Sequence, residues 1–131
     1  MIMTITMPSI RITTQKIKIL EYLWSVNHHP TADEIYSEVK KDLPAISLAT
    51  VYRNLHSLAE EGDIQKIEVN KEFRFDGDIS PHQHCVCKKC GNISEIFSKD
   101  IARHSMQNAE TEDFEPHSVK TIFHGICREC K

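Results

Sequence analysis

The stretch Ile46-Ser-Leu-Ala-Thr-Val-Tyr-Arg-Asn-Leu-His-Ser-Leu-Ala-Glu-Glu-Gly62 decides the fold of the first half of the chain. Ser47 is a suitable N-cap, and Gly62 stands where a helix should stop, so a helix is predicted over 48–61. Three apolar residues at helical spacing form its expected buried face: Val51, Leu55 and Leu58.

The opposite face of this helix has residues of the kinds that contact DNA: Ala49, Thr50, Tyr52, Arg53 and His56. Small residues at the start of a helix allow close approach to the major groove. Arginine can bind guanine through two hydrogen bonds, and tyrosine can bond a phosphate. A plain helical hairpin in a protein interface would show the same periodicity, so the neighbouring elements have to decide.

Two more helices are predicted before this one, over 14–26 and 32–43. In the second, Thr31 and Glu34 form a capping-box pattern. The apolar residues expected to face the core are Ile17, Leu20, Leu23 and Trp24 in the first helix, and Ile35 and Val39 in the second.

Alternating segments over 64–69 and 72–76 follow the third helix, with Asn70-Lys71 as the turn between them. This pattern predicts a two-stranded wing. Three helices followed by a wing favour DNA binding, and we assign residues 1–76 to an N-terminal winged helix-turn-helix domain.

Gly and Pro among short polar residues near 76–81 indicate a linker. After it we predict strands over 84–88 and 92–97, a helix over 99–109 and a long strand over 116–126, which make 77–131 a small α/β domain and the whole chain α+β. The phenylalanines are expected in the core: Phe73, Phe75, Phe97, Phe114 and Phe123.

Four of the five cysteines form two Cys-x-x-Cys pairs separated by 36 residues: Cys87, Cys90, Cys127 and Cys130. Such pairs suit tetrahedral Zn²⁺, and Gly91 permits the tight bend after the first pair. A structural zinc ion would supply stability that the small hydrophobic core of so short a domain cannot provide. Redox-active dithiols and disulfides are the alternatives. Cys85, of the same strand parity as Cys87, is either a substitute ligand or an ordinary buried thiol.

His82 and His84 lie on one face of the predicted strand, opposite in parity to the cysteines. With Asp76 and Glu95 they would form a nitrogen and oxygen set suited to iron, manganese or zinc. Two histidines near acidic residues also occur simply as surface residues, so spacing leaves this site open.

The formal charge is −3, with 9 Lys and Arg against 11 Asp and Glu in 1–76, and 7 against 8 in 77–131. Because cations supply most non-specific DNA affinity, a local basic surface has to do so here. The chain has no apolar run long enough for a membrane span, and Met1 to Met7 lack the basic start of a signal peptide. We therefore expect a cytoplasmic protein that does not enter a membrane.

The third-helix stretch, together with several other motifs, resembles the ferric uptake regulator family across nearly the whole chain. These motifs are Arg11-Ile-Thr-Thr-Gln-Lys16, His29-Pro-Thr-Ala-Asp-Glu-Ile-Tyr36, Phe73-Arg-Phe-Asp76, His82-Gln-His84, Cys87-Lys-Lys-Cys90-Gly91 and Gly125-Ile-Cys-Arg-Glu-Cys130. The resemblance implies a homodimeric repressor that binds operator DNA.

Within the family the chain is most similar to the peroxide-stress regulators. That resemblance implies that a regulatory Fe(II) or Mn(II) bridges the two domains and is bound by five residues: His29, Asp76, His82, His84 and Glu95. It also implies that bound Fe(II) reacts with hydrogen peroxide and oxidises a ligand histidine, His29 or His82, after which the metal is lost and repression ends.

Three departures from the family pattern bear on function. Glu95 replaces the aspartate of peroxide sensors; Val119 replaces a common histidine, with His117 two residues away. Only ten residues precede Arg11, where the family has a further helix. Operator contacts therefore fall mainly to Arg11, Lys16, Tyr52 and Arg53.

Three other functions stay open. The first is an iron- or zinc-uptake regulator without peroxide sensing. The second is a zinc-stabilised adaptor that has lost DNA binding. The third is a metal-dependent hydrolase, although no general base separate from the ligands and no nucleophile motif is found.

Overall fold

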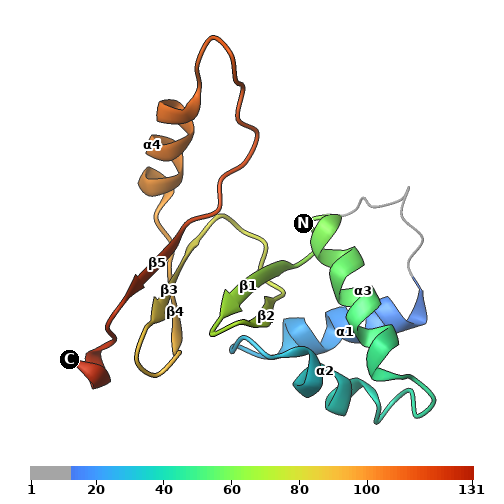
Figure 1. Ribbon diagram of the computed structural model, residues 1–131. Helices are drawn as coiled ribbons and strands as arrows, with labels where there is room; N and C mark the ends of the chain where they lie inside the picture. The colour runs from blue at the N-terminus through green and yellow to red at the C-terminus, as the bar shows by residue number, and fades with distance from the viewer. Residues whose placement is uncertain (1–12) are drawn as a thin grey trace. The chain divides into compact units, whose positions relative to one another are not determined.

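The computed structural model describes residues 13–131, and the chain divides into two compact units (Figure 1). Among the described residues, the first unit comprises 13–68 together with Glu72–Asp78, and the second comprises Val69–Lys71 with Ile79–Lys131. Within the described range, no helix has the length and apolar character needed to cross a membrane.

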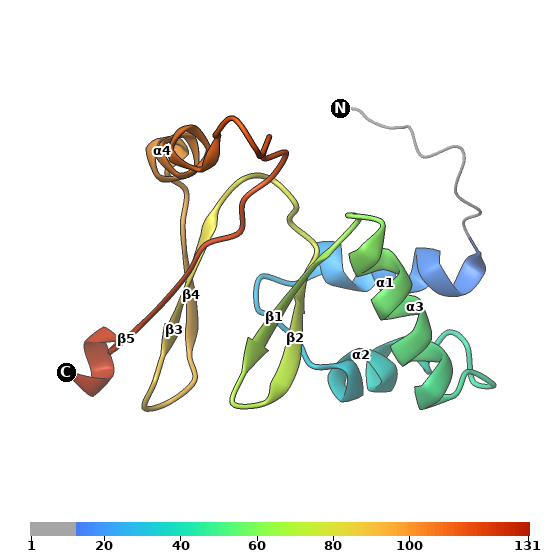
Figure 2. The ribbon, with the colours of Figure 1, turned by 45° about the horizontal axis from the view of Figure 1, so that its top comes forward.

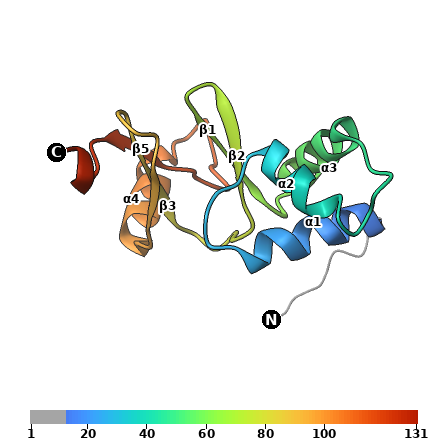
Figure 3. The same ribbon diagram turned by 90° about the horizontal axis from the view of Figure 1, so that it is seen from below.

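Three helices form the core of the first unit: α1 (Thr14–Ser25), α2 (Ala32–Val39) and α3 (Leu48–Glu60). Figure 3 shows them packed as one group. Each begins at a hydroxyl N-cap, and the capping box predicted in α2 is present. The N–H of Thr31 donates to Glu34 Oε1 at 2.8 Å, and the N–H of Glu34 donates to Thr31 Oγ1 at 3.3 Å.

Two details of these helices differ from the prediction. In α1 the buried face contains Ile19, Leu20 and Leu23, whereas Ile17 and Trp24 are exposed. Apolar residues cover more than one face of α1, so helical periodicity does not determine which face is buried. Packing against the other helices determines it. Helix α2 ends at Val39, short of Leu43. Leu43 itself precedes Pro44, which disfavours a helical conformation at that residue.

The predicted wing is confirmed as a two-stranded sheet of β1 (Gln65–Val69) and β2 (Glu72–Asp76). Asn70 and Lys71 form its turn with φ values of 53° and 67°. Positive φ at both central residues matches the right-handed twist of a hairpin. Phe75 of β2 is buried in the core of the three helices, so the hairpin is fixed to them.

The second unit is built on a three-stranded sheet in the order β4-β3-β5 (Figure 2). The central strand β3 (Gln83–Cys87) pairs antiparallel with β4 (Ile93–Ile96) and parallel with β5 (Ile122–Gly125). Helix α4 (Lys99–Ala109) follows β4, and a short 3-10 turn (Arg128–Cys130) ends the chain.

The long strand predicted over 116–126 is wrong, because only Ile122–Gly125 forms β5. Strand β3 offers partners only from His84 to Cys87, and a strand needs a neighbour to satisfy its backbone groups.

Only Phe75 among the phenylalanines is buried as expected. The other four are exposed: Phe73, Phe97, Phe114 and Phe123. Three of these belong to the second unit, where α4 buries no residue. A unit this small has too little volume to enclose them.

Candidate metal centres and DNA-contacting face

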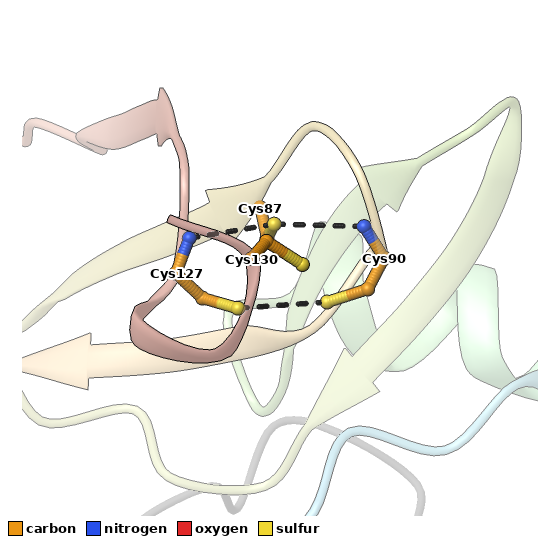
Figure 4. A group of neighbouring side chains, drawn as sticks. All are labelled: Cys87, Cys90, Cys127 and Cys130. Carbon is orange, nitrogen blue, oxygen red and sulfur yellow. Dashed lines mark hydrogen bonds between the residues drawn. The ribbon is translucent and has the colours of Figure 1, made fainter.

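The four cysteines of the two Cys-x-x-Cys pairs come together at one end of the second unit (Figure 4). Cys87 ends β3, and Cys90 lies in the turn that follows; Cys127 directly precedes the final 3-10 turn, and Cys130 is its last residue. Their sulfur atoms all lie within 4.8 Å of one another, and those of Cys90 and Cys127 are 3.7 Å apart. None of the four forms a disulfide.

Backbone groups prepare Cys87 to bind a cation. Its sulfur accepts hydrogen bonds from the N–H of Cys90 at 3.5 Å and of Cys127 at 3.4 Å. These bonds lower the pKa of Cys87 to about 6. By contrast, hydrogen bonds with the Cys127 and Cys87 sulfurs raise the pKa of Cys130 to about 12. The cluster can therefore become fully ionised only when a cation balances its charge.

The sulfur geometry fits Zn²⁺. Four sulfurs bound at about 2.3 Å to one tetrahedral ion lie about 3.8 Å from each other. The 3.7 Å between Cys90 and Cys127 matches this value and is far longer than a disulfide bond of about 2.05 Å. Cys85 is half-buried, lies opposite Ser94 and Phe123 in the sheet, and does not belong to the cluster.

A second group of donors lies on the other face of the same sheet. His84 is the direct partner of Glu95 in the β3–β4 register, and His82 precedes β3. Nε2 of His82 lies 2.9 Å from Glu95 Oε2 and 3.1 Å from His84 Nε2, and His84 Nε2 lies 3.7 Å from the same carboxylate oxygen. Donor atoms about 2.1 Å from one ion and at right angles lie about 3 Å apart, so this set fits a nitrogen and oxygen metal site.

The carbonyl of Ser80 fixes the chemistry of His82. It lies 2.6 Å from Nδ1 of His82, so this nitrogen donates its hydrogen there. In the neutral ring, Nε2 then presents a lone pair to Glu95, which is itself an acceptor. Two facing acceptors at 2.9 Å need a proton or a metal ion between them. Sequence reasoning missed Ser80, because a backbone carbonyl leaves no side-chain signal.

His29 and Asp76 meet within the first unit. His29 Nε2 lies 3.3 Å from Asp76 Oδ2, and both side chains are buried. The other oxygen of Asp76 accepts a hydrogen bond from the N–H of Asp78 at 2.9 Å. The structure therefore pairs a nitrogen donor with an oriented carboxylate in this unit.

The residues proposed for DNA contact lie where the helical periodicity predicts. On α3, Ala49, Tyr52 and Arg53 are exposed, and Thr50 is half-buried at the first turn. An Nη atom of Arg53 donates to Thr50 Oγ1 at 3.3 Å. Opposite this face, Val51, Leu55 and Leu58 are buried as expected.

Of the two basic residues predicted to contact DNA near the start of the chain, the structure describes Lys16 but not Arg11. Nζ of Lys16 donates to Ser57 Oγ at 2.9 Å, so the first turn of α1 is tied to α3. Sequence reasoning had no signal for this contact, because 41 residues separate the two side chains. Arg11 lies outside the described residues.

His117 belongs to no group of three or more candidate metal ligands in residues 13–131. Its Nε2 lies 3.0 Å from Glu115 Oε2, and both side chains are largely exposed.

These features define a class of protein: a winged helix with an exposed third helix, joined to a unit with a four-cysteine metal cluster. The model of the Ferric uptake regulator family matches residues 8–124. The peroxide-responsive repressor PerR of Staphylococcus epidermidis is 34% identical over 123 residues, which cover 93% of this chain and 82% of the relative.

Solved structures show the same relationship. The peroxide stress regulator of Campylobacter jejuni has a TM-score of 0.76 at 33% identity and covers 88% of both chains. The ferric uptake regulator of Pseudomonas aeruginosa with manganese also has a TM-score of 0.76, at 23% identity with 92% of both chains covered, which shows the fold alone. The chain belongs to the ferric uptake regulator family, and is thus a metal-responsive regulator.

Proposed function

We propose that the protein is a metal-dependent, DNA-binding transcriptional repressor that responds to peroxide, iron or both through a regulatory Fe(II) or Mn(II) ion. The observation that supports this best is the close approach of three candidate ligand atoms: Nε2 of His82 lies 2.9 Å from Glu95 Oε2 and 3.1 Å from His84 Nε2. Imidazole nitrogens and a carboxylate oxygen at these separations form a ligand set suited to Fe(II) or Mn(II).

The proposed ligands form two sets. His29 and Asp76 are one pair, and His82, His84 and Glu95 form a triad. Two donors are too few to hold an ion, and we propose, from the family resemblance, that both sets bind the same one. Differential affinity of the ion for one arrangement of the chain would then shift the population towards the DNA-binding state.

The four cysteines would hold Zn²⁺ as a structural ion, and the protein would act as a homodimer on double-stranded operator DNA. Curated relatives are repressors, which supports a regulatory and not an enzymatic role. The proposed DNA contacts are Arg11, Lys16, Ala49, Thr50, Tyr52 and Arg53. We also propose residues 1–76 as the DNA-binding domain and 77–131 as the dimerisation domain.

Peroxide sensing would follow from the ligand histidines. Fe(II), if bound, would supply the redox chemistry by which hydrogen peroxide oxidises a neighbouring imidazole, with one peroxide oxygen added to the ring and the other leaving as water. Oxidation of His29 would remove a donor from the pair with Asp76. Oxidation of His82 would remove the acceptor that faces Glu95. Either change would weaken the site and end repression.

Two measurements test the proposal. Operator fragments should bind the zinc-loaded protein more tightly with Mn(II) than without it, and the affinity should fall with rising salt. After Fe(II) loading and peroxide treatment, peptide mass spectrometry should find an added oxygen on His29 or His82. DNA binding that responds to neither metal nor salt would contradict the repressor function.

The longer side chain of Glu95, where peroxide sensors have aspartate, favours a second candidate. An iron- or zinc-uptake regulator would use the same ligands without oxidation. Histidines that stay unmodified after peroxide treatment, in a protein whose DNA binding still follows the metal concentration, would support this candidate. Glu95→Asp should then increase histidine oxidation if the length of the carboxylate arm is what suppresses it.

A further inference from the structure

Arg74 lies beside the segment that holds His29, and no part of the proposed function uses it. It is the residue between Phe73 and Phe75 on β2 and is half-buried. An Nη atom of Arg74 donates a hydrogen bond to the backbone carbonyl of His29 at 3.3 Å. The two residues are 45 positions apart in the chain, so folding of the first unit brings them together.

The backbone already joins the same two segments. Phe75 N–H donates to the carbonyl of Pro30 at 2.9 Å, and Arg74 and Thr31 form an isolated antiparallel bridge. The strand β2 therefore pairs with Pro30 and Thr31 without any help from the arginine side chain. Any residue of high strand propensity at position 74 would preserve this pairing.

Burial of the Arg74 side chain costs free energy, because one of its hydrogen-bond donors is left unpaired. Its Nε is buried and has no hydrogen-bond partner among the described residues. Native proteins rarely bury such a donor unpaired, and each instance calls for an explanation. We attribute the burial of the Arg74 guanidinium to its hydrogen bond with the His29 carbonyl.

Three consecutive residues of β2 thus act on the donor pair. Arg74 and Phe75 hold the backbone of His29 and Pro30, while Asp76 directs Oδ2 towards the imidazole at 3.3 Å. Metal affinity depends on such supporting contacts, because a ligand that must be ordered on binding loses free energy.

We propose that Arg74 is a positioning residue for the regulatory metal: it fixes the backbone of His29 so that the imidazole meets Asp76 before an ion binds. The inference rests on the proposed function, since it assumes that His29 is a metal ligand. Arg74 itself does not touch the ion.

The test uses the full chain with zinc in the cysteine cluster, titrated with Mn(II) and followed by electron paramagnetic resonance of the free ion. Arg74→Ala should weaken Mn(II) binding by about 10- to 100-fold, the range for lost supporting contacts. Arg74→Lys, which keeps a cationic donor, should recover part of the affinity. Arg103→Ala removes an exposed arginine on α4 and should bind Mn(II) as the wild type does.

Hydrogen exchange supplies a readout that a general loss of stability would not reproduce. In Arg74→Ala the amides of His28, His29 and Thr31 should exchange faster, while those in α1 and α3 keep wild-type rates; Pro30 has no amide hydrogen. If the core amides accelerate equally, or if both Arg74 variants lose their helical circular dichroism, Arg74 supports the fold and the proposal is overturned.

His29→Ala separates the two possible failures. If it abolishes Mn(II) binding while Arg74→Ala binds like the wild type, the proposed function stands and the role of Arg74 is wrong. If His29→Ala also binds Mn(II) like the wild type, the proposed ligand set fails, and the role of Arg74 fails with it.

Discussion

The carbonyl of Ser80 fixes the tautomer of His82, and the amides of Cys90 and Cys127 stabilise Cys87 as a thiolate. At the scale of single residues, then, backbone groups decide which atom of a side chain can act as a ligand. Ser80 and Cys90 lie in the segments before and after β3, and Cys127 follows β5, so the local backbone path matters as much as the residue type.

Replacing Cys87 by serine should remove one of the four thiolate ligands of the cysteine cluster. Zinc content should fall from about one ion per chain to near zero, since structural zinc needs all four thiolates. Elemental analysis of purified protein measures this. Cys85→Ser is the matched control on the same strand and should retain full zinc content; loss of zinc there would show that Cys85 is a ligand.

Zinc uptake by the metal-free protein should depend on pH through Cys87. Its pKa is lowered to about 6, so the thiolate is present above that pH and disappears as the pH falls through it. The rate of uptake, followed by stopped flow with a coloured zinc indicator, should be half-maximal near pH 6. A midpoint near 8.5, the value of an ordinary thiol, would contradict the ordered apo cluster.

At the scale of a single element, helix α3 has three faces with different environments: one in the core, one against α1 and one in solvent. The stripe of Val51, Leu55 and Leu58 is buried in the core. A middle stripe contacts α1, where Asn54 donates to Gln15 and Lys16 donates to Ser57. The remaining face is exposed, so packing on two sides leaves the third side, which has the proposed DNA contacts, facing solvent.

Arg53→Ala should reduce operator affinity by about 1–3 kcal/mol and relax sequence preference at one base pair, as expected for the loss of a bidentate contact with guanine. Binding to a set of single-base operator variants, by fluorescence anisotropy, measures both effects. Arg103→Ala removes an equal charge from exposed α4 and should change neither. A uniform loss across all variants would instead indicate a phosphate contact.

Lys16 should contribute to DNA binding in two separable ways. Its contact with Ser57 uses one of three ammonium hydrogens, so the others can still reach a phosphate. Lys16→Met should lower the slope of log affinity against log salt by about 0.9. Ser57→Ala removes the anchor but not the charge, and should weaken binding with the slope unchanged. Equal slopes for all three proteins would exclude a phosphate contact by Lys16.

At the scale of the whole molecule, the two units bury apolar residues very differently. The first has a continuous core of helical residues closed by Phe75. The second leaves large apolar side chains exposed, including Phe97, Phe114 and Phe123. Burial of such side chains against a second copy of the chain would fit the proposed homodimer.

Phe123→Glu should therefore weaken self-association. The residue lies on β5 and is 43% exposed, so the charge would meet an apolar partner surface in a dimer but only water in a monomer. Sedimentation equilibrium should show at least a tenfold rise in the dimer dissociation constant. Zinc content is the control for folding. An unchanged dimer would place the interface elsewhere.

Sequence periodicity and spacing were sufficient for the local features of this protein. The faces of α3, the capping box at Thr31, the wing turn at Asn70 and the pairing of the cysteine motifs follow from interactions within a few residues or from a strict metal geometry. Such interactions depend on residue type and order alone.

Only the tertiary structure decided which apolar stripe of α1 is buried, how short β5 is, and which phenylalanines stay exposed. It also placed the Arg74 guanidinium on the carbonyl of His29 and Lys16 on Ser57. These contacts join segments about 40 residues apart, and the available partner surface, which no local pattern encodes, determines whether they form.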